Sequence, residues 1–377
     1  MKIVIAPDKF KGSLTGFEFC NAVEKGLKNV ISDIEIIKMP LADGGDGTAE
    51  VVKYYLEGEK VTLKASDPLF RSINTWYVYS KKEKIAYIEM AEISGLQLLQ
   101  ENERNSMYTT SLGTGQLIVD AMEKGVKQII LGIGGSATND GGMGMAKALG
   151  YQFLDENDQE LKPVGCNLQK VKEIDASNIH PKLREVEVVV ACDVSNPFYG
   201  KSGAAHVYAA QKGASKEEIV LLDDGLRNFA KVVSKKFDID LQEISGSGAA
   251  GGMGGGALIF LKGQLHSGIE IIKELANFDK TIANADWIIT GEGKLDNQTL
   301  SGKTISGVLK SAKAKNIPVA ALCGAVTVSN EDVEVLGLDY IDAISKNCKN
   351  LEEAISNVYP NLVESAIRFG KSLKVKP

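Results

Sequence analysis

The sequence has few of the residues that most often carry metal or nucleophile chemistry. Its three histidines lie far apart, at His180, His206 and His266, and no H-E-x-x-H zinc motif is present. The five cysteines are odd in number and include no C-x-x-C pair, which argues against a disulfide framework and a zinc site. We therefore expect reduced thiols in a cytoplasmic protein whose chemistry depends on carboxylates, lysines and backbone amides.

Long apolar runs and concentrated positive charge are also missing. No uninterrupted apolar segment reaches the roughly 18 residues that a membrane span requires. The apolar stretch near the N-terminus is about four residues long, shorter than the core of a signal peptide. The net charge is −6 and the chain has no basic tail, so we expect neither nucleic acid nor a membrane as a partner. A homo-oligomer stays open, because the sequence does not indicate the oligomeric state.

Glycine, in contrast, is abundant. Its 39 copies among 377 residues are well above the roughly 7% of an average protein. The copies gather in a few short segments, which are the most informative feature of the sequence. The remaining composition is that of an ordinary globular protein, with 44% hydrophobic residues and enough length for two domains.

Strands alternate with helices at both ends of the chain, which indicates parallel sheets. Near the N-terminus, the strand predicted at 2–6 precedes a helix that begins with a capping box formed by Thr15 and Glu18. Near the C-terminus, the strand at 286–290 precedes a long loop and a second helix at 305–316. The N-terminal strands are too few for a sheet of their own, and the C-terminal strands supply the missing neighbours.

The middle of the chain has a different pattern. Two apolar segments flank the polar KKEK at 81–84, which is typical of a β-hairpin. The fold class is therefore α/β, with two α/β domains. We predict one domain built from 1–60 plus 281–377, and a second, inserted α/β domain with a mixed sheet at 61–280.

The glycine clusters follow candidate strands. In parallel α/β sheets ligands bind at the carboxyl ends of the strands, and glycines let backbone N–H groups converge on an anion there. A following helix adds the partial positive charge of its N-terminus, so these loops suit phosphate. Four such loops comprise residues 6–13, 42–48, 132–142 and 290–304, and a fifth cluster at 246–257 precedes an apolar segment.

Charged residues in the same loops or at strand ends fit this interpretation. Carboxylates beside phosphate are expected where Mg²⁺ lies between them, and lysines can neutralise the charge of a transferred phosphoryl group. The carboxylates are Asp43, Asp46, Asp140, Asp193, Glu292 and Asp296, and the lysines are Lys9, Lys11 and Lys303.

Each feature also has a structural interpretation. A single glycine-rich loop is more often a tight turn than a phosphate site. Asp46 or Asp140 taken alone is more often a helix cap. The glycines at 251–256 are also compatible with close packing of a helix. The combination of four loops with acidic residues favours ligand binding.

One loop also matches a dinucleotide fingerprint. Gly132, Gly134 and Ala137 form G-x-G-x-x-A after a strand, and Asp155 follows another candidate strand. In a Rossmann fold the helix would begin within this motif. Here the glycine-rich NDGGMG segment at 139–144 disfavours helix, since each glycine costs up to about 1 kcal/mol.

The chain resembles the bacterial-type glycerate kinases of the type 1 family over nearly its whole length. The matching motifs are APDKFKGSLT, PLADGGDGTAE, TSLGTGQLI, GIGGSATNDGGMGMAKALG, ACDVSNPFYG, QKGAS, GAAGGMGGGAL and ITGEGKLDNQTLSGKT. Mild departures occur at Lys9, Asp46 and Lys294, where serine, glutamate and arginine are common, and in AAQKGA at 209–214, which lacks the usual Gly-Pro. The departure at position 9 weakens any role for that side chain.

The resemblance implies ATP-dependent phosphorylation of D-glycerate at its 2-hydroxyl, which gives 2-phosphoglycerate. It also implies that one of the two α/β domains is flavodoxin-like and that the active site lies in the cleft between the domains. We predict ATP and Mg²⁺ as the cofactors and D-glycerate as the small-molecule partner.

Roles for single residues are predictions from this combined interpretation. Asp193, at the end of a strong strand, is the first candidate for the catalytic base, and Asp8 is the second. Lys11, with Lys9 as a weaker candidate, would meet the transferring phosphoryl group. The metal candidates are Asp43, Asp46 and Glu292.

The binding residues are assigned in the same way. The segment GGSATNDGG at 134–142 is predicted to be an anion nest, for either the substrate carboxylate or a nucleotide phosphate. The predicted substrate-binding residues are Arg71, Gly134, Gly135, Ser136, Asn139 and Asp140. The predicted nucleotide-binding residues are Gly44, Gly45, Gly291, Gly293 and Lys303.

Two other functions stay open at this point. An NAD(P)-dependent hydroxy-acid oxidoreductase would use the G-x-G-x-x-A loop at 132–137 and would bind a nicotinamide cofactor without Mg²⁺. A non-catalytic sugar-acid or phosphate-binding protein would close on its ligand without turnover.

Overall fold

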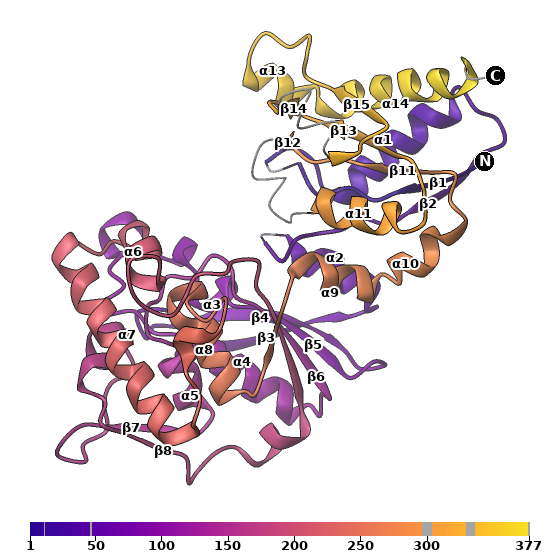
Figure 1. The fold of residues 1–377 in the computed structure, drawn as a ribbon. Helices are drawn as coiled ribbons and strands as arrows, with labels where there is room; N and C mark the ends of the chain where they lie inside the picture. The colour runs from indigo at the N-terminus through magenta and orange to yellow at the C-terminus, as the bar shows by residue number, and fades with distance from the viewer. Residues whose placement is uncertain (11, 46, 296–303, 329–335, 376–377) are drawn as a thin grey trace. The chain divides into compact units, whose positions relative to one another are not determined.

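The computed structural model describes the chain except for residues 11, 46, 296–303, 329–335 and 376–377. Its contacts divide the chain into two compact units. We call Met1–Asp43 together with Ile269–Pro377 the terminal unit, and Gly44–Gly268 the inserted unit (Figure 1). The predicted domains, 1–60 plus 281–377 and 61–280, stay a prediction.

The terminal unit contains a five-stranded sheet in which all neighbouring strands are parallel. Its strands are β1 (Lys2–Ile5), β2 (Glu35–Lys38), β11 (Trp287–Thr290), β13 (Val319–Cys323) and β15 (Tyr340–Ala343). The spatial order is β15-β13-β11-β1-β2. Counted in chain order within this unit, that is the 2-1-3-4-5 order of flavodoxin-like sheets, so the predicted flavodoxin-like fold class is confirmed.

Helices cover both faces of this sheet, which explains why its central strands are apolar on both sides. Helices α1 (Gly16–Lys28) and α14 (Val358–Val375) lie side by side on one face, and α11 (Thr304–Lys313) lies on the other (Figure 1). Ile3 and Ile5 belong to the same core cluster as α1 and α14. The remaining elements are α9 (Gly268–Leu275), α10 (Phe278–Thr281), α13 (Leu351–Ser356) and the short parallel pair β12 (Lys294–Leu295) and β14 (Ala325–Val326).

Helix α1 begins where the sequence predicted. Thr15 is its N-cap, and the Thr15 hydroxyl oxygen accepts from the Glu18 amide at 3.2 Å. The Glu18 carboxylate accepts in return from the Thr15 amide at 2.8 Å, which completes the capping box. Phe19, Val23 and Leu27 form the buried stripe of this helix.

The inserted unit contains a six-stranded mixed sheet, as predicted. Its strands are β3 (Glu59–Ser66), β4 (Ser72–Ser80), β5 (Ile85–Glu89), β6 (Gln128–Gly132), β9 (Glu187–Ala191) and β10 (Gln264–His266), in the order β10-β9-β6-β5-β4-β3. Strands β3, β4 and β5 pair antiparallel, and β5, β6, β9 and β10 pair parallel. The predicted hairpin is β4–β5, with KKEK at its turn. A separate antiparallel pair is formed by β7 (Gln152–Leu154) and β8 (Glu173–Asp175).

The helices of the inserted unit are α2 (Thr48–Tyr55), α3 (Ala91–Ser94), α4 (Leu112–Glu123), α5 (Met143–Ala148), α6 (Ala204–Tyr208), α7 (Lys216–Phe237) and α8 (Ala249–Phe260). Phe153, Phe229 and Phe260 pack together in its core at ring distances of 5.7–6.2 Å. Glycine lets α8 approach the loop before α5 closely, because a Cβ on Gly256 would lie 2.5 Å from the Gly141 carbonyl oxygen. Among the described residues, no helix is long and apolar enough to span a membrane.

The contact of α1 with α14 gives a stability prediction. Replacing glycine with alanine in an exposed helix interior stabilises it by up to about 1 kcal/mol. At Gly26, however, a Cβ would lie 2.5 Å from the Val363 carbonyl oxygen and 2.6 Å from the Ala366 Cβ. Overpacking of this kind costs about 1–3 kcal/mol, so we expect Gly26→Ala to lower the melting temperature measured by circular dichroism.

The neighbouring substitution Lys25→Ala is the control, because Lys25 is exposed on the same helix. It is expected to leave the melting temperature within about one degree of the wild type, since surface changes are usually neutral. A higher melting temperature for Gly26→Ala would show that propensity outweighs the clash.

Candidate active site

In the inserted unit, the carboxyl ends of the parallel strands bring predicted and unpredicted residues to one edge of the sheet. Strand β5 ends at Glu89, and β6 leads into the loop that starts at Gly134. Strand β9 is followed by Asp193, and β10 is followed by Gly268. The parallel pairing therefore explains why these separate segments of the chain meet.

A pocket of about 220 Å³ lies at this edge. Its size is below the roughly 300–1,000 Å³ that drug-sized ligands need, so it suits a ligand of a few heavy atoms. It brings together the predicted nucleotide-binding pair Gly44 and Gly45 with the predicted substrate-binding pair Gly134 and Gly135. The other lining residues are Glu89, Ala91, Leu96 and Gln97.

Glu89 was missed by the sequence analysis. It supplies the carboxylate among the residues that line this pocket. Glu89 is the last residue of β5, and it pairs with Gly132 at the end of β6, the strand that precedes the glycine loop. This position at a strand end is the signal that would have identified it.

The first half of the glycine loop is held by backbone pairing with the segment before it. The Leu96 amide donates to the Gly135 carbonyl at 2.9 Å, and the Ala137 amide donates to the Ser94 carbonyl at 2.9 Å. Gly135 has φ +70°, a conformation that favours glycine. This pairing fixes Gly134 and Gly135 at the wall of the pocket.

The second half of the loop is held by Asp140. Its fully buried carboxylate accepts from the Ser111 amide (2.8 Å), the Ser111 hydroxyl (2.7 Å), the Gly142 amide (3.2 Å) and the Gly144 amide (3.1 Å). Removal from water raises the pKa of Asp140, and these hydrogen bonds oppose that shift. The carboxylate thus anchors the starts of α4 and α5, which is the capping role that the sequence left open.

Two neighbours of Asp140 have unsatisfied polar groups. Asn139 is fully buried, and neither its Oδ1 nor its Nδ2 has a hydrogen-bond partner. The Thr138 hydroxyl is also buried without a partner. Such groups are rare in native proteins and are consistent with a site that a ligand or water completes.

Lys212 supports the same loop and was also missed. Its ammonium donates to the Ser136 Oγ at 2.8 Å and to the Thr138 carbonyl oxygen at 2.6 Å. The side chain is 2% exposed, and burial lowers the pKa of Lys212 to about 7. The family-like motif QKGAS contains this lysine, but sequence alone did not reveal its burial.

Asp193, the first candidate for the base, is an exposed residue after β9. Its Oδ1 accepts from the Gly268 amide at 3.0 Å, which orients the carboxyl group. Its Oδ2 would lie 3.9 Å from a Cβ placed on Gly44. Asp193 is therefore close to a residue that lines the pocket.

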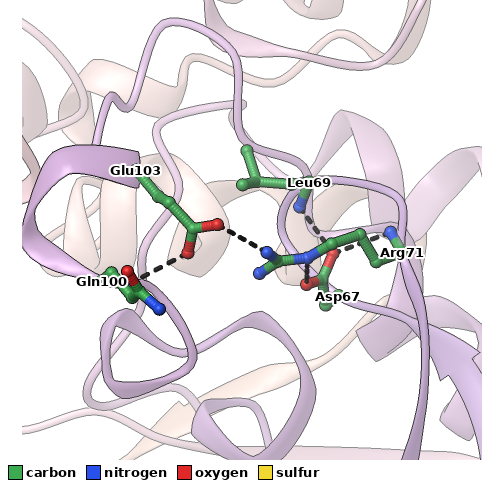
Figure 2. A network of polar contacts seen from close by, with 5 residues as sticks. All are labelled: Asp67, Leu69, Arg71, Gln100 and Glu103. Atoms are coloured by element: carbon green, nitrogen blue, oxygen red, sulfur yellow. Dashed lines mark hydrogen bonds and ion pairs between the residues drawn. The ribbon is translucent and has the colours of Figure 1, made fainter.

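Arg71 has a different environment, which Figure 2 shows. Its guanidinium pairs with the buried Asp67 through Nε at 2.5 Å and with Glu103 through Nη1 at 2.6 Å. Asp67 also accepts from the Leu69 and Arg71 amides, at 2.8 Å each. Arg71 is not among the residues that line the pocket of Gly134, and binding glycerate would require it to share a charge that two carboxylates already compensate.

The terminal unit carries a second group of predicted residues at the carboxyl edge of its own sheet. Asp8 follows β1, Asp43 follows β2, and Glu292 follows β11 and is 8% exposed. The Thr304 hydroxyl donates to Asp8 Oδ2 at 2.6 Å. Burial and the nearby charge of Asp43 raise the pKa of Asp8 to about 6.

The glycines beside Glu292 shape this edge. A Cβ on Gly291 would lie 2.1 Å from the Leu322 carbonyl oxygen, so only glycine fits there. The Gly293 carbonyl accepts from the Ala325 amide at 3.1 Å. Four other predicted residues lie outside the described part of the chain: Lys11, Asp46, Asp296 and Lys303.

The carboxylates of this edge fit Mg²⁺ as a partial ligand set. Mg²⁺ in kinases is usually bound by one or two carboxylates together with substrate phosphates. Asp43 is a second carboxylate near Asp8, because its charge adds to the effect of burial in raising the pKa of Asp8. Within the described residues, no group of three or more acidic, histidine or cysteine side chains could hold a metal by itself, so phosphate oxygens would have to complete the coordination.

The geometry of the G-x-G-x-x-A loop argues against a dinucleotide site. Helix α5 begins at Met143, well after Ala137, whereas a Rossmann helix begins within the motif. Asp155 lies in a turn after β7, and its Oδ1 accepts from the Asn157 and Gln159 amides. Strand β7 belongs to a separate antiparallel pair, so the acidic residue is not at the end of a neighbouring parallel strand.

The terminal unit has a flavodoxin-like sheet order and carboxylates at one edge of its sheet, and the inserted unit has a small pocket lined by glycines. These features are typical of an α/β enzyme for a small anionic substrate. Comparison with known proteins specifies this class. A family model described as the glycerate kinase family matches residues 3–374. The chain belongs to the glycerate kinase family, and it is therefore a phosphotransferase that acts on ATP and glycerate.

Individual relatives agree with the family match. A glycerate kinase of Halalkalibacterium halodurans is 43% identical over 97% of this chain and 96% of its own length. A glycerate 2-kinase of Escherichia coli K12 is 40% identical over 100% of this chain and 98% of its own length. A crystal structure from Salmonella typhimurium LT2, assigned as a glycerate kinase 2, is 40% identical and has a TM-score of 0.90, with 99% and 98% of the two chains covered.

The raised pKa of Asp8 leads to a prediction about stability and pH. An aspartate in the unfolded chain titrates near 3.9, but Asp8 in the folded protein titrates at about 6. The folded state therefore binds the proton more tightly, and Asp8 costs stability progressively as the pH rises from about 4 to about 6. We expect Asp8→Asn to raise the melting temperature at pH 7.5, by a gain of about 1–3 kcal/mol, and to have no such effect at pH 4.

Thermal unfolding at both pH values measures this difference. Asp33→Asn, at an exposed position of the same unit, is the control and is expected to change neither melting temperature. A lower melting temperature for Asp8→Asn at pH 7.5 would contradict the prediction.

Proposed function

We propose that this enzyme transfers the γ-phosphoryl group of ATP to the 2-hydroxyl of D-glycerate, giving 2-phosphoglycerate and ADP. The observation that carries the proposal is the end-to-end match to a relative that is named a glycerate 2-kinase. In this reaction the hydroxyl proton passes to a carboxylate, and a bond forms from the hydroxyl oxygen to the γ-phosphorus. The bond between that phosphorus and the oxygen bridging to the β-phosphate breaks.

D-glycerate would bind in the pocket of the inserted unit. The substrate is small, and the pocket of about 220 Å³ is small as well. The amides of Gly134 and Gly135 would donate to its carboxylate, as expected of an anion nest. Glu89 would accept a hydrogen bond from a substrate hydroxyl, since an ionised carboxylate is an acceptor only.

The nucleotide would be bound by the remaining glycine loops. Gly44 and Gly45 stay our candidates for contact with phosphate, and their place beside Gly134 supports delivery of the γ-phosphoryl group to bound glycerate. The further candidates of the terminal unit are Gly291, Gly293, Lys303 and Lys11.

Mg²⁺ would be held by carboxylates from the loops at 42–48 and 290–304. Asp43 and Glu292 are the candidates among the described residues, with Asp46 as the third proposed ligand. When bound, the ion would neutralise charge on the phosphate oxygens and hold them in a fixed geometry.

Asp193 is our proposed base. Its Oδ1 is oriented by the Gly268 amide, and its Oδ2 faces the region of Gly44, a pocket residue. A carboxylate oriented in this way can accept the proton of the attacking hydroxyl. Asp8 is the second candidate, because a carboxyl group with a pKa of about 6 is ionised at neutral pH and is a stronger base than an ordinary aspartate.

A coupled assay tests the proposed function. Purified protein, ATP, Mg²⁺ and D-glycerate are incubated with enolase and pyruvate kinase, without phosphoglycerate mutase. We expect pyruvate, because enolase accepts 2-phosphoglycerate and not the 3-isomer. Glycerate-dependent ADP without pyruvate would move the phosphoryl group to the 3-hydroxyl, and no glycerate-dependent ADP would overturn the proposal.

The role of Asp193 can be tested by a conservative substitution. Asp193→Asn keeps an oxygen that can accept from the Gly268 amide, so the local structure is expected to persist. We expect kcat to fall by about 100-fold or more, because general bases contribute roughly that much. Asp224→Asn, at an exposed position on α7, is the control. Near-wild-type turnover of a folded Asp193→Asn variant would exclude Asp193 as the base.

The position of glycerate can be tested at Gly134. A Cβ there would have one neighbour within 4 Å, the Gly44 carbonyl oxygen at 3.8 Å, so Gly134→Ala adds a methyl group at the pocket without a clash. We expect the KM for D-glycerate to rise about tenfold while the melting temperature stays unchanged. A change confined to the KM for ATP would assign this wall of the pocket to the nucleotide instead.

A further inference from the structure

Lys212 is a buried cation that the mechanism above does not use. Its Nζ has three N–H donors but two acceptors, the Ser136 hydroxyl at 2.8 Å and the Thr138 carbonyl at 2.6 Å. Within the described part of the chain, the ammonium group forms no ion pair, and its direct partners are these two oxygens. Burying an unpaired ammonium is costly, so such a group points to a function.

The backbone holds Lys212 in this position. The Lys212 amide donates to the Ala209 carbonyl at 3.0 Å. The next residue, Gly213, has φ +88°, and a Cβ there would lie 2.0 Å from the Arg104 carbonyl oxygen. The turn is therefore packed directly against the backbone at Arg104, and this packing fixes the position of Lys212 beside the glycine loop.

Ser136 connects Lys212 to the pocket. Because the Ser136 oxygen accepts from Lys212, its hydroxyl hydrogen is available to donate elsewhere, and no acceptor for it occurs in the described structure. Ser136 is 7% exposed and directly follows Gly135, which lines the pocket. An oriented hydroxyl donor therefore lies within the proposed anion nest.

We propose that Lys212 is a positioning residue for glycerate, which acts through Ser136 to make the loop Gly134–Ser136 a site for the substrate's carboxylate. The inference rests on the proposed function of the pocket. Arg71 is less suited to this role, since two carboxylates already compensate its charge. The charge of Lys212 lacks such a direct partner, and an incoming carboxylate would compensate it.

Asp140 is the charged group that acts on Lys212 from the same loop. Its negative charge favours the protonated lysine, whereas burial disfavours it, and burial is the larger effect. The oxygens of Asp140 are taken up by hydrogen bonds from Ser111, Gly142 and Gly144. Asp140 therefore favours the protonated form of Lys212 but forms no ion pair with it, which leaves that position to the substrate's carboxylate.

Two variants test the proposal, Lys212→Met and Ser136→Ala, with steady-state kinetics for each substrate. We expect each variant to raise the KM for D-glycerate about tenfold or more, as for the loss of a hydrogen bond to a charged group. The KM for ATP is expected to stay within about twofold. Because Lys212 acts through Ser136, the double variant should raise the glycerate KM by much less than the product of the two single effects.

Lys212→Arg and Lys182→Met complete the set. Lys212→Arg keeps the charge and should recover part of the glycerate affinity that Lys212→Met loses. Lys182→Met is the matched control, because Lys182 precedes β9 and so lies at the opposite edge of the sheet, in a surface pair with Glu123. It is expected to change neither KM.

The pH dependence gives a readout that a purely structural role would not. A lysine is charged below its pKa, so the glycerate KM of the wild type should rise as the pH increases above about 7. Bound carboxylate favours the charged lysine and raises the pKa of Lys212 in the complex, so the KM should keep rising until the pH reaches that higher value. The KM of Lys212→Met should be high and free of this dependence between pH 6.5 and 8.5.

The outcomes separate this inference from the proposed function. If the wild type forms no glycerate-dependent ADP, the proposed function fails. If the wild type is active and the folded variants leave the glycerate KM within twofold, or raise the KM for ATP instead, the role of Lys212 is wrong. If Lys212→Met does not fold, Ser136→Ala and the wild-type pH profile decide in the same way.

Discussion

The buried carboxylate of Asp140 is the constraint on which the candidate active site depends. A carboxylate without water is stable only when hydrogen bonds replace its hydration. Here the donors come from the starts of α4 and α5, so the loop between β6 and α5 cannot move without leaving that charge unsatisfied. This fixes the second half of the loop, and the pairing with Ser94 and Leu96 fixes the first half. Gly134 and Gly135 therefore line the pocket as a preorganised wall, which would reduce the entropy lost on binding.

Both units use the same physical arrangement to gather polar groups. Parallel strands end together, and short side chains or glycines after them leave backbone amides accessible at that edge. In the inserted unit the edge forms a pocket lined by four glycines and one carboxylate residue, Glu89. In the terminal unit it gathers carboxylates, and burial together with the charge of Asp43 raises the pKa of Asp8. The first edge suits an organic anion, and the second suits a metal that accompanies phosphate.

Local patterns predicted the elements that depend on local physics. The capping box at Thr15, the hairpin around KKEK and the alternation of strands and helices needed only neighbouring residues. Helix α7 was not predicted, although Ser215 and Glu218 form the same capping box at its start. The flavodoxin-like order came from the resemblance and not from the periodicity.

The candidate site was less predictable, because its key features are tertiary. Lys212 looks like any solvated lysine until the fold buries it, and the two carboxylates that pair with Arg71 come from different segments. Glu89 has no motif of its own, and only the pairing of β5 with β6 brings it to the glycine loop. The sequence predicted which loops bind ligands. The packing shows which side chains lie beside or contact those loops.

The central strand of the terminal unit has one further consequence, for the order of synthesis. Strand β1 pairs with β2 on one side and with β11 on the other. The whole inserted unit, residues 44–268, is translated after β2 and before β11. At about 5–20 residues per second, the ribosome needs roughly 10–45 s to produce that segment. During this interval β1 has an open, apolar edge, which is the kind of surface that aggregates or recruits chaperones. Rapid folding of the inserted unit shortens the effective loop that must close when β11 emerges, so it would protect the nascent terminal unit.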